Sequence, residues 1–458
     1  MQPSLLRPRV PASLAVAIAC LSSFMVVMDS TIVNVALPSI GTDLGLPAAS
    51  LHWVVDAYLL MLGGFMLLAA RAGDLFGRRP ILQAGLFVFT AASLVGGLAP
   101  NGAMLLIARA VQGLGASVLA TSTLALIVAV CPGSAERRRA ISIWAASSSI
   151  ASAVGVGIGG LLTTLAGWRW VMFVNVPIGT LLAAMIAVCL SRGPARQDRQ
   201  PLDVPGALSI TLGMGLLMYG ISQSATQGWS APTVLTAWSA AAMLLLAFVR
   251  IEATGKHPLV RLDIFRLHNV RMGNIVVLGL GACLTASTFL TSLLLQQTLG
   301  YGALDTGLAL LPMGLALAVS AMTSRALMDR GVRQLPFVGG LLCAAGLMWM
   351  SAAPDQAIYA ADVLGPTLCI GTGLGLMLMT ATHTALDGVP PQDAGLASGL
   401  FNTARQLGAA LGVSALSSLT EWQGHHAAFI ATATFAVLSA IASLSLRPGA
   451  HTLAQHKA

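Results

Sequence analysis

Long apolar runs alternate with short polar connections along almost the whole chain. The 458-residue sequence is 56% hydrophobic and only 9% charged, which is more apolar surface than a water-soluble fold of ordinary proportions can bury. Because a helix needs about 20 apolar residues to cross a membrane, we count fourteen candidate spans. They are centred near residues 25, 60, 90, 115, 152, 180, 213, 241, 282, 315, 343, 369, 408 and 435. The sequence therefore predicts an all-α polytopic membrane protein.

The basic residues give an independent check on this count, because cytoplasmic loops collect Lys and Arg. With the N-terminus inside and fourteen spans, all but three of the 24 basic residues fall on the cytoplasmic side. The exceptions are Arg169 outside and Arg109 and Arg405 within spans. We therefore expect a multi-pass membrane protein with both termini in the cytoplasm. The net charge of +8 reflects this topology and predicts no nucleic-acid partner.

Several kinds of chemistry find no support in the sequence. The P-loop pattern GxxxxGK[ST] is missing, since the Gly255-Lys256 pair is followed by His257. A formal GxGxxG at Gly155, Gly157 and Gly160 lies inside an apolar span and does not follow a strand, so we interpret it as a site of close helix packing. The six cysteines never form a CxxC pair. We expect no enzyme, no metal and no cofactor.

A degenerate repeat indicates two related halves. The second span is followed by basic residues around Asp74 and Gly77, and the tenth by a similar set around Asp329 and Gly331, at an offset of about 255 residues. The offset pairs spans 1 to 6 with spans 9 to 14 and leaves two spans between them. We therefore predict an N-terminal half over 1–192, two inserted helices over 193–250 and a C-terminal half over 251–458.

Four ionisable residues inside spans are the best functional candidates, because a charge at mid-bilayer costs about 2.5 to 3.5 kcal/mol. They are Asp29, Asp56, Arg109 and Arg405. At 1.5 Å per residue, the first three come out at a similar depth in the outer half of the bilayer. An Asp29–Arg109 pair with Asp56 nearby is thus allowed.

The functional hypothesis is a proton site. Arg109 favours the ionised form of Asp29 when it is close, and burial favours the protonated form when the pair separates. The alternative is a fixed buried ion pair, or a residue that faces a water-filled cavity. Arg405 has no carboxylate at its depth, so carbonyl groups, Asn402 or a substrate are its candidate partners.

The chain resembles the major facilitator superfamily over nearly its whole length, and within that superfamily it resembles the fourteen-span drug:proton antiporters. The segments that carry the resemblance are Asp29 to Pro38 (DSTIVNVALP), Trp53 to Tyr58 (WVVDAY), Ala70 to Arg79 (ARAGDLFGRR), Arg109 with Gln112, Gly113 and Gly115, and Ala151 with Gly155, Gly159 and Gly160.

The resemblance implies roles for these segments. The Arg of the span-four motif, here Arg109, is implicated in proton coupling, and the inner loop supports gating. In that loop we expect Asp74 to meet the positive end of a helix or an arginine across the seam between halves, and Gly77 to permit a tight turn. The alternative role of Arg78 and Arg79 is to anchor topology.

The function implied is proton-coupled export of hydrophobic or cationic drugs, antibiotics or biocides across the bacterial cytoplasmic (inner) membrane. We expect a small-molecule substrate, a lipid bilayer, protons as the coupling ion and a monomer. Val156 stands where the span-five antiporter motif usually has Pro, which favours the alternative of a symporter or facilitator for a metabolite. A transporter fold that acts as a sensor without transport is a second alternative.

Overall fold

The computed structural model describes residues 12–131, 133–189, 201–330, 332, 334–354, 356–386, 389–390 and 393–446. Its elements are helical, as expected where apolar segments must satisfy every backbone hydrogen bond internally. Within the described residues, twelve helices are long and apolar enough to cross a membrane, and a further apolar helix, Leu335–Ser351, is shorter. All fourteen predicted span centres fall on helices, but the last two share one helix, Ala394–Ser443.

The chain divides into two compact units, which are described separately. The first unit comprises 1–208 together with 302–308, and the second comprises 209–301 and 309–458. The two helices predicted as an insertion between halves lie mostly with the second unit. The three-part division at 192 and 250 stays a prediction.

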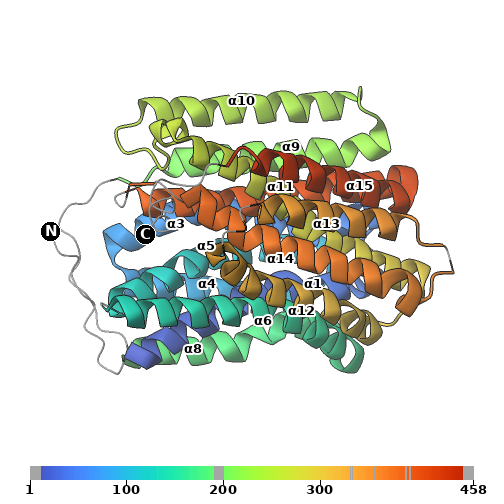
Figure 1. The fold of residues 1–458 in the computed structure, drawn as a ribbon, viewed down its shortest axis with the longest axis horizontal. Coiled ribbons are helices and arrows are strands. Elements are labelled where there is room, and N and C mark those ends of the chain that lie inside the picture. The colour runs from blue at the N-terminus through green and yellow to red at the C-terminus, as the bar shows by residue number, and fades with distance from the viewer. Residues whose placement is uncertain are drawn as a thin grey trace. The chain divides into compact units, whose positions relative to one another are not determined.

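The first unit is a bundle of long helices joined by short connections (Figure 1). Its helices are α1 (Ala12–Leu44), α2 (Ala48–Leu51), α3 (Trp53–Phe76), α4 (Arg78–Gly97), α5 (Gly102–Val130), α6 (Ser134–Ala166), α7 (Arg169–Phe173) and α8 (Asn175–Cys189).

Local sequence sets where several of these helices begin and end. Asn101 caps α5 by accepting a hydrogen bond from the Met104 backbone N–H at 2.9 Å. Gly77 separates α3 from α4 with a φ of 94°, a conformation that side chains rarely adopt. Gly167, with a φ of 86°, follows the last residue of α6 in the same way.

The second unit contains the remaining long helices and three short helical turns. The long helices are α9 (Val204–Gln227), α10 (Pro232–Thr254), α11 (His268–Leu293), α12 (Ala303–Asp329), α13 (Leu335–Ser351), α14 (Leu364–Leu386) and α15 (Ala394–Ser443), and the turns are Leu262–Arg266, Leu294–Thr298 and Tyr359–Val363. The first residues of α9 and α12 cluster with the first unit.

Helix α15 is interrupted near its middle. Its 50 residues include Gly424, whose φ of 84° and ψ of 176° are not helical. Polar residues surround this break in the sequence TEWQGHH, residues 420–426. The break explains why two predicted span centres fall on one element.

Glycines bring α6 into direct contact with α1, the packing predicted for this part of the sequence. A Cβ added at Gly155 would lie 2.3 Å from Thr31 Oγ1, and one added at Gly159 would lie 2.5 Å from the Ile32 carbonyl oxygen. At Gly160 the nearest atom would be the Ala303 carbonyl oxygen, at 2.4 Å, in the segment of α12 that belongs to the same unit. Larger residues at these positions would therefore push the helices apart.

We expect Gly159→Ala to lower the thermal stability of the purified protein, because the added methyl group must displace the α1 backbone, at a cost of about 1–3 kcal/mol. The matched control is Gly395→Ala, since nothing lies within 4 Å of a Cβ added there. Thermal unfolding in detergent measures both. Equal midpoints for the two variants would contradict the close approach of α6 to α1.

Candidate functional site

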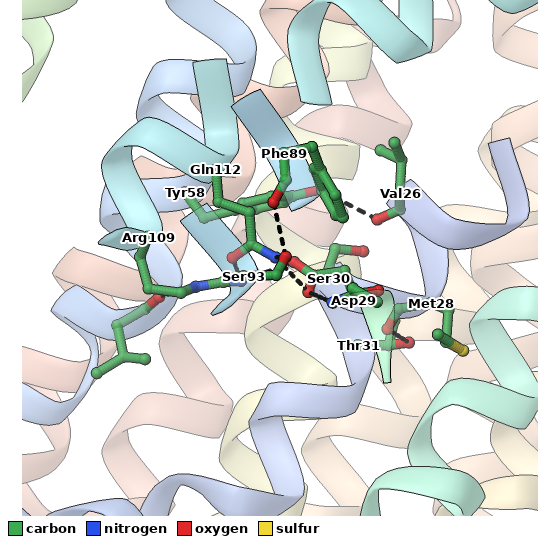
Figure 2. A network of polar contacts seen from close by, with 12 residues as sticks. Val26, Met28, Asp29, Ser30, Thr31, Tyr58, Phe89, Ser93, Arg109 and Gln112 are labelled. Atoms are coloured by element: carbon green, nitrogen blue, oxygen red, sulfur yellow. Dashed lines mark hydrogen bonds and ion pairs between the residues drawn. The ribbon is translucent and has the colours of Figure 1, made fainter. Parts of the chain in front are cut away.

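Asp29 lies at the centre of the candidate site, on α1. Its side chain is 0% exposed. The next two residues on the helix are also polar, but their hydroxyl groups donate back to the same helix: Ser30 Oγ to the Val27 carbonyl at 2.7 Å and Thr31 Oγ1 to the Met28 carbonyl at 3.0 Å (Figure 2). The Asp29 carboxylate therefore depends on other helices for its partners.

Three side chains from two other helices donate to this carboxylate. Arg109 Nη1 lies 2.6 Å from Asp29 Oδ2, which confirms the ion pair that the depth estimate allowed. Gln112 Nε2 donates to Asp29 Oδ1 at 2.8 Å, and Asn175 Nδ2 donates to the same oxygen at 2.7 Å. Arg109 and Gln112 are one turn apart on α5, so they share a face, and Asn175 is the first residue of α8.

A second layer of contacts fixes the donors themselves (Figure 2). Arg109 Nε donates to the Val54 carbonyl at 2.9 Å, and the guanidinium lies 4.3 Å from the centroid of the Tyr58 ring. Gln112 Nε2 also donates to Ser93 Oγ at 2.8 Å. The network thus joins α1, α3, α4, α5 and α8, and its buried charges are paired as buried charges must be.

Asp56, the other acidic candidate, has a different environment. It lies one turn after His52 at the start of α3, and its side chain is 0% exposed. Neither carboxylate oxygen of Asp56 has a hydrogen-bond partner among the described residues. His52 Nε2 lies 3.8 Å from Asp56 Oδ2, which is an ion-pair distance but too long for a direct hydrogen bond.

The first two residues of α4, which follow Gly77, contact two other helices near their C-terminal ends. Arg78 donates to the Ala125 carbonyl near the C-terminal end of α5, and Arg79 Nη2 donates to the Ala187 carbonyl of α8 at 2.9 Å. Asp74, in the last turn of α3, is half-exposed and its Oδ1 lies 3.6 Å from Arg78 Nη2. Cations favour the negative C-terminal ends of helices, so these arginines stabilise the first unit. Contacts across the seam, predicted for Asp74, stay a prediction.

The last intramembrane candidate, Arg405, is on α15 in the second unit. Its side chain is half-buried. None of the ion pairs formed by the described residues includes it.

The predicted counterpart of the inner loop after α12 is described only in part. Gly331 and Arg333 lie outside the described residues, as do the side chains of Arg325 and Asp329. The repeat between the two loops therefore stays a prediction.

Sequence reasoning did not assign Asn175, Ser93 or His52 to the site. Uncharged polar residues in an apolar run carry a weaker signal than charges, because their burial costs less when they are hydrogen-bonded. The useful signal for Asn175 would have been an amide at the first turn of a span, where it can point into the bundle.

Comparison with known proteins gives a consistent result. The family model of the Major Facilitator Superfamily matches residues 19–413. The cephamycin export protein of Amycolatopsis lactamdurans is 38% identical over 414 residues, covering 89% of this chain and 85% of that protein. The puromycin resistance protein of Streptomyces alboniger is 38% identical over 415 residues, covering 90% and 82%. The solved POT family transporter PepTSo superposes with a TM-score of 0.69 at 14% identity, covering 98% of this chain and 100% of that one.

We expect Arg109→Leu to destabilise the protein by about 3–5 kcal/mol, because it leaves the Asp29 carboxylate buried without its counter-charge. The double variant Asp29→Asn with Arg109→Gln, which removes both charges, should recover most of this loss. Thermal unfolding followed by tryptophan fluorescence measures the difference, with Arg250→Leu at an exposed position as the control for loss of a positive charge. A double variant no more stable than Arg109→Leu would show that charge pairing is not what holds the site.

Proposed function

The chain belongs to the Major Facilitator Superfamily, and from this premise we propose that it is a proton-coupled antiporter that exports antibiotics or similar drugs. The relatives that support this are named for antibiotic export and antibiotic resistance and share 38% of residues over about nine tenths of the chain. The observation that carries the proposal is a fully buried carboxylate network inside the membrane helices of such a chain.

Protons are the proposed coupling ion because of these carboxylates. Ionisable groups within membrane helices are costly and mark ion or proton pathways. We assign to Asp29, Arg109 and Asp56 together the coupling of proton movement to the opening and closing of the site. No cofactor is required, and we propose that the protein works as a monomer in the lipid bilayer on small-molecule substrates. A symporter or facilitator for a metabolite is the alternative that Val156 favours.

We further propose fourteen membrane crossings with both termini in the cytoplasm of a bacterium. A continuous 50-residue helix such as α15 would be about 75 Å long, more than twice the hydrocarbon thickness. Its break at Gly424 supports two crossings, and the polar residues around Gly424 suit the membrane surface. Two crossings by α15, one by the shorter helix α13 and one by each of the other eleven long apolar helices give fourteen.

Cells that express the protein should accumulate several-fold less ethidium, or less of at least one antibiotic in a panel that includes puromycin, than cells that lack it. An uncoupler should abolish the difference, because the proton gradient drives export. Asp29→Asn should abolish it too, since it removes the charge that Arg109 requires, whereas Asp263→Asn at an exposed position should not. The absence of uncoupler-sensitive efflux for every compound in the panel would refute the proposal.

We also propose that Asp74, Gly77, Arg78 and Arg79 form an inner gate. Asp74→Asn should then slow proton-driven transport in inverted vesicles while expression stays normal, because the closed state loses contacts of the carboxylate. Asp263→Asn again serves as the control. Unchanged rate and coupling in Asp74→Asn would refute the gate.

A further inference from the structure

Asp29 and Asp56 are both fully buried carboxylates, but the structure gives them opposite environments. Asp29 accepts three hydrogen bonds, from Arg109, Gln112 and Asn175. Asp56 accepts none from the described residues. Hydrogen-bond donors stabilise the ionised form of a carboxylate, and burial without donors destabilises it.

Asp29 supplies the counter-charge of Arg109 in this arrangement. The Arg109 side chain is only 1% exposed, and its Nη1 lies 2.6 Å from Asp29 Oδ2. An uncompensated buried charge is strongly destabilising. The negative charge of Asp29 is therefore already engaged in holding Arg109.

The same reasoning gives the opposite result for Asp56. An ionised Asp56 beside a neutral His52 would be a buried negative charge without donors. One proton shared by the two side chains makes the pair neutral, either as carboxylic acid with imidazole or as carboxylate with imidazolium. His52 is itself 1% exposed, and its ring nitrogen lies 3.8 Å from the carboxylate, so the charge on either group controls the charge on the other.

We propose that the His52–Asp56 pair, and not the Asp29–Arg109 pair, loads and releases the proton that is exchanged for drug. This inference rests on the proposed antiport function and specifies its proton site. In the closed state the pair holds one proton. When the site opens to water, hydration stabilises the Asp56 carboxylate and the proton leaves to the solvent, and uptake from the opposite side restores the neutral pair. His52 acts as a positioning residue that holds the proton next to Asp56.

The position of Asp56 on α3 connects this proton to the ion-pair network. Asp56 lies between Val54 and Tyr58, and both of these residues contact Arg109. The Asp56 backbone N–H donates to the His52 carbonyl at 2.9 Å. A change of charge on Asp56 therefore acts on the same turn of helix that holds Arg109.

Few other charged groups surround this turn. Asp29 on α1 and Arg109 on α5 neutralise each other, Asp43 near the end of α1 pairs with Arg169 of α7, and α2 carries no titratable residue. The arginines of α4, Arg78 and Arg79, are at its first turn, near the far end of α3. Among the described groups, His52 is thus the partner that sets the charge of Asp56.

Infrared difference spectroscopy of the purified full-length protein in lipid nanodiscs, between acid and alkaline pH, tests the proposal without any substrate. We expect a pH-dependent C=O band of a protonated carboxylic acid in the wild-type protein. The band should disappear in Asp56→Asn, persist in Asp29→Asn and have its pH midpoint shifted by roughly one pH unit in His52→Gln. If Asp29→Asn fails to fold, the neutral pair Asp29→Asn with Arg109→Gln replaces it. Loss of the band with Asp29 rather than Asp56, or an unchanged midpoint in His52→Gln, would overturn the proposal.

A transport measurement distinguishes failure of this proton site from failure of the proposed antiport function. In proteoliposomes with an imposed pH gradient and ethidium as the probe, Asp56→Asn should lose about tenfold or more of the proton-driven exchange, and His52→Gln should shift its pH profile. If Asp56→Asn keeps wild-type coupling, the inference fails and the antiporter stands. If the wild-type protein moves no probe but the infrared band follows Asp56 and His52, export of the probe fails and the proton site stands.

Discussion

The pairing of one carboxylate with one guanidinium, both out of reach of water, sets the arrangement of the first unit. Each charge alone would be costly in a membrane-embedded bundle, so every helix that contributes to their neutralisation must stay in place. Asp29 on α1, Arg109 and Gln112 on α5, and Asn175 on α8 meet within hydrogen-bond distance. Val54 on α3 and Ser93 on α4 then fix the donors. Five helices are held in register by one buried pair.

Close packing makes this polar centre possible. In a bilayer the hydrophobic effect does not drive helices together, and small residues that let backbones approach take its place. Gly155 and Gly159 of α6 face the α1 turn from Met28 to Ile32, the turn that carries Asp29. The carboxylate is therefore enclosed by donors on one side of α1 and by a tightly packed helix on another.

The sequence predicted the positions of the helices well, because a long apolar run has few alternatives to a helix in a membrane. It also indicated that an Asp29–Arg109 pair was geometrically allowed, since depth along a span follows from residue number. Depth does not give the rotation of each helix. Asp56 is at a similar predicted depth, but it is about 200° around the axis of α3 from Val54. Val54 contacts Arg109, whereas Asp56 pairs with His52. The amide donor Asn175 is uncharged, so it did not stand out within its apolar segment. The break in α15 at Gly424 could be recognised only from the backbone angles.

The arginines at the start of α4 connect the end of the bundle near Gly77 with the buried carboxylate of Asp29. Arg78 and Arg79 donate to carbonyl groups near the ends of α5 and α8, at Ala125 and Ala187. Among the described residues, these two helices also supply the side-chain donors to Asp29. The contacted ends lie about 24 Å along α5 from Arg109 and about 18 Å along α8 from Asn175. Each of these two helices therefore joins a contact of Arg78 or Arg79 at one end to a hydrogen bond with Asp29 further along. A displacement of these helix ends can therefore change the hydrogen bonds to Asp29, although Arg78 and Arg79 donate no hydrogen bond to it.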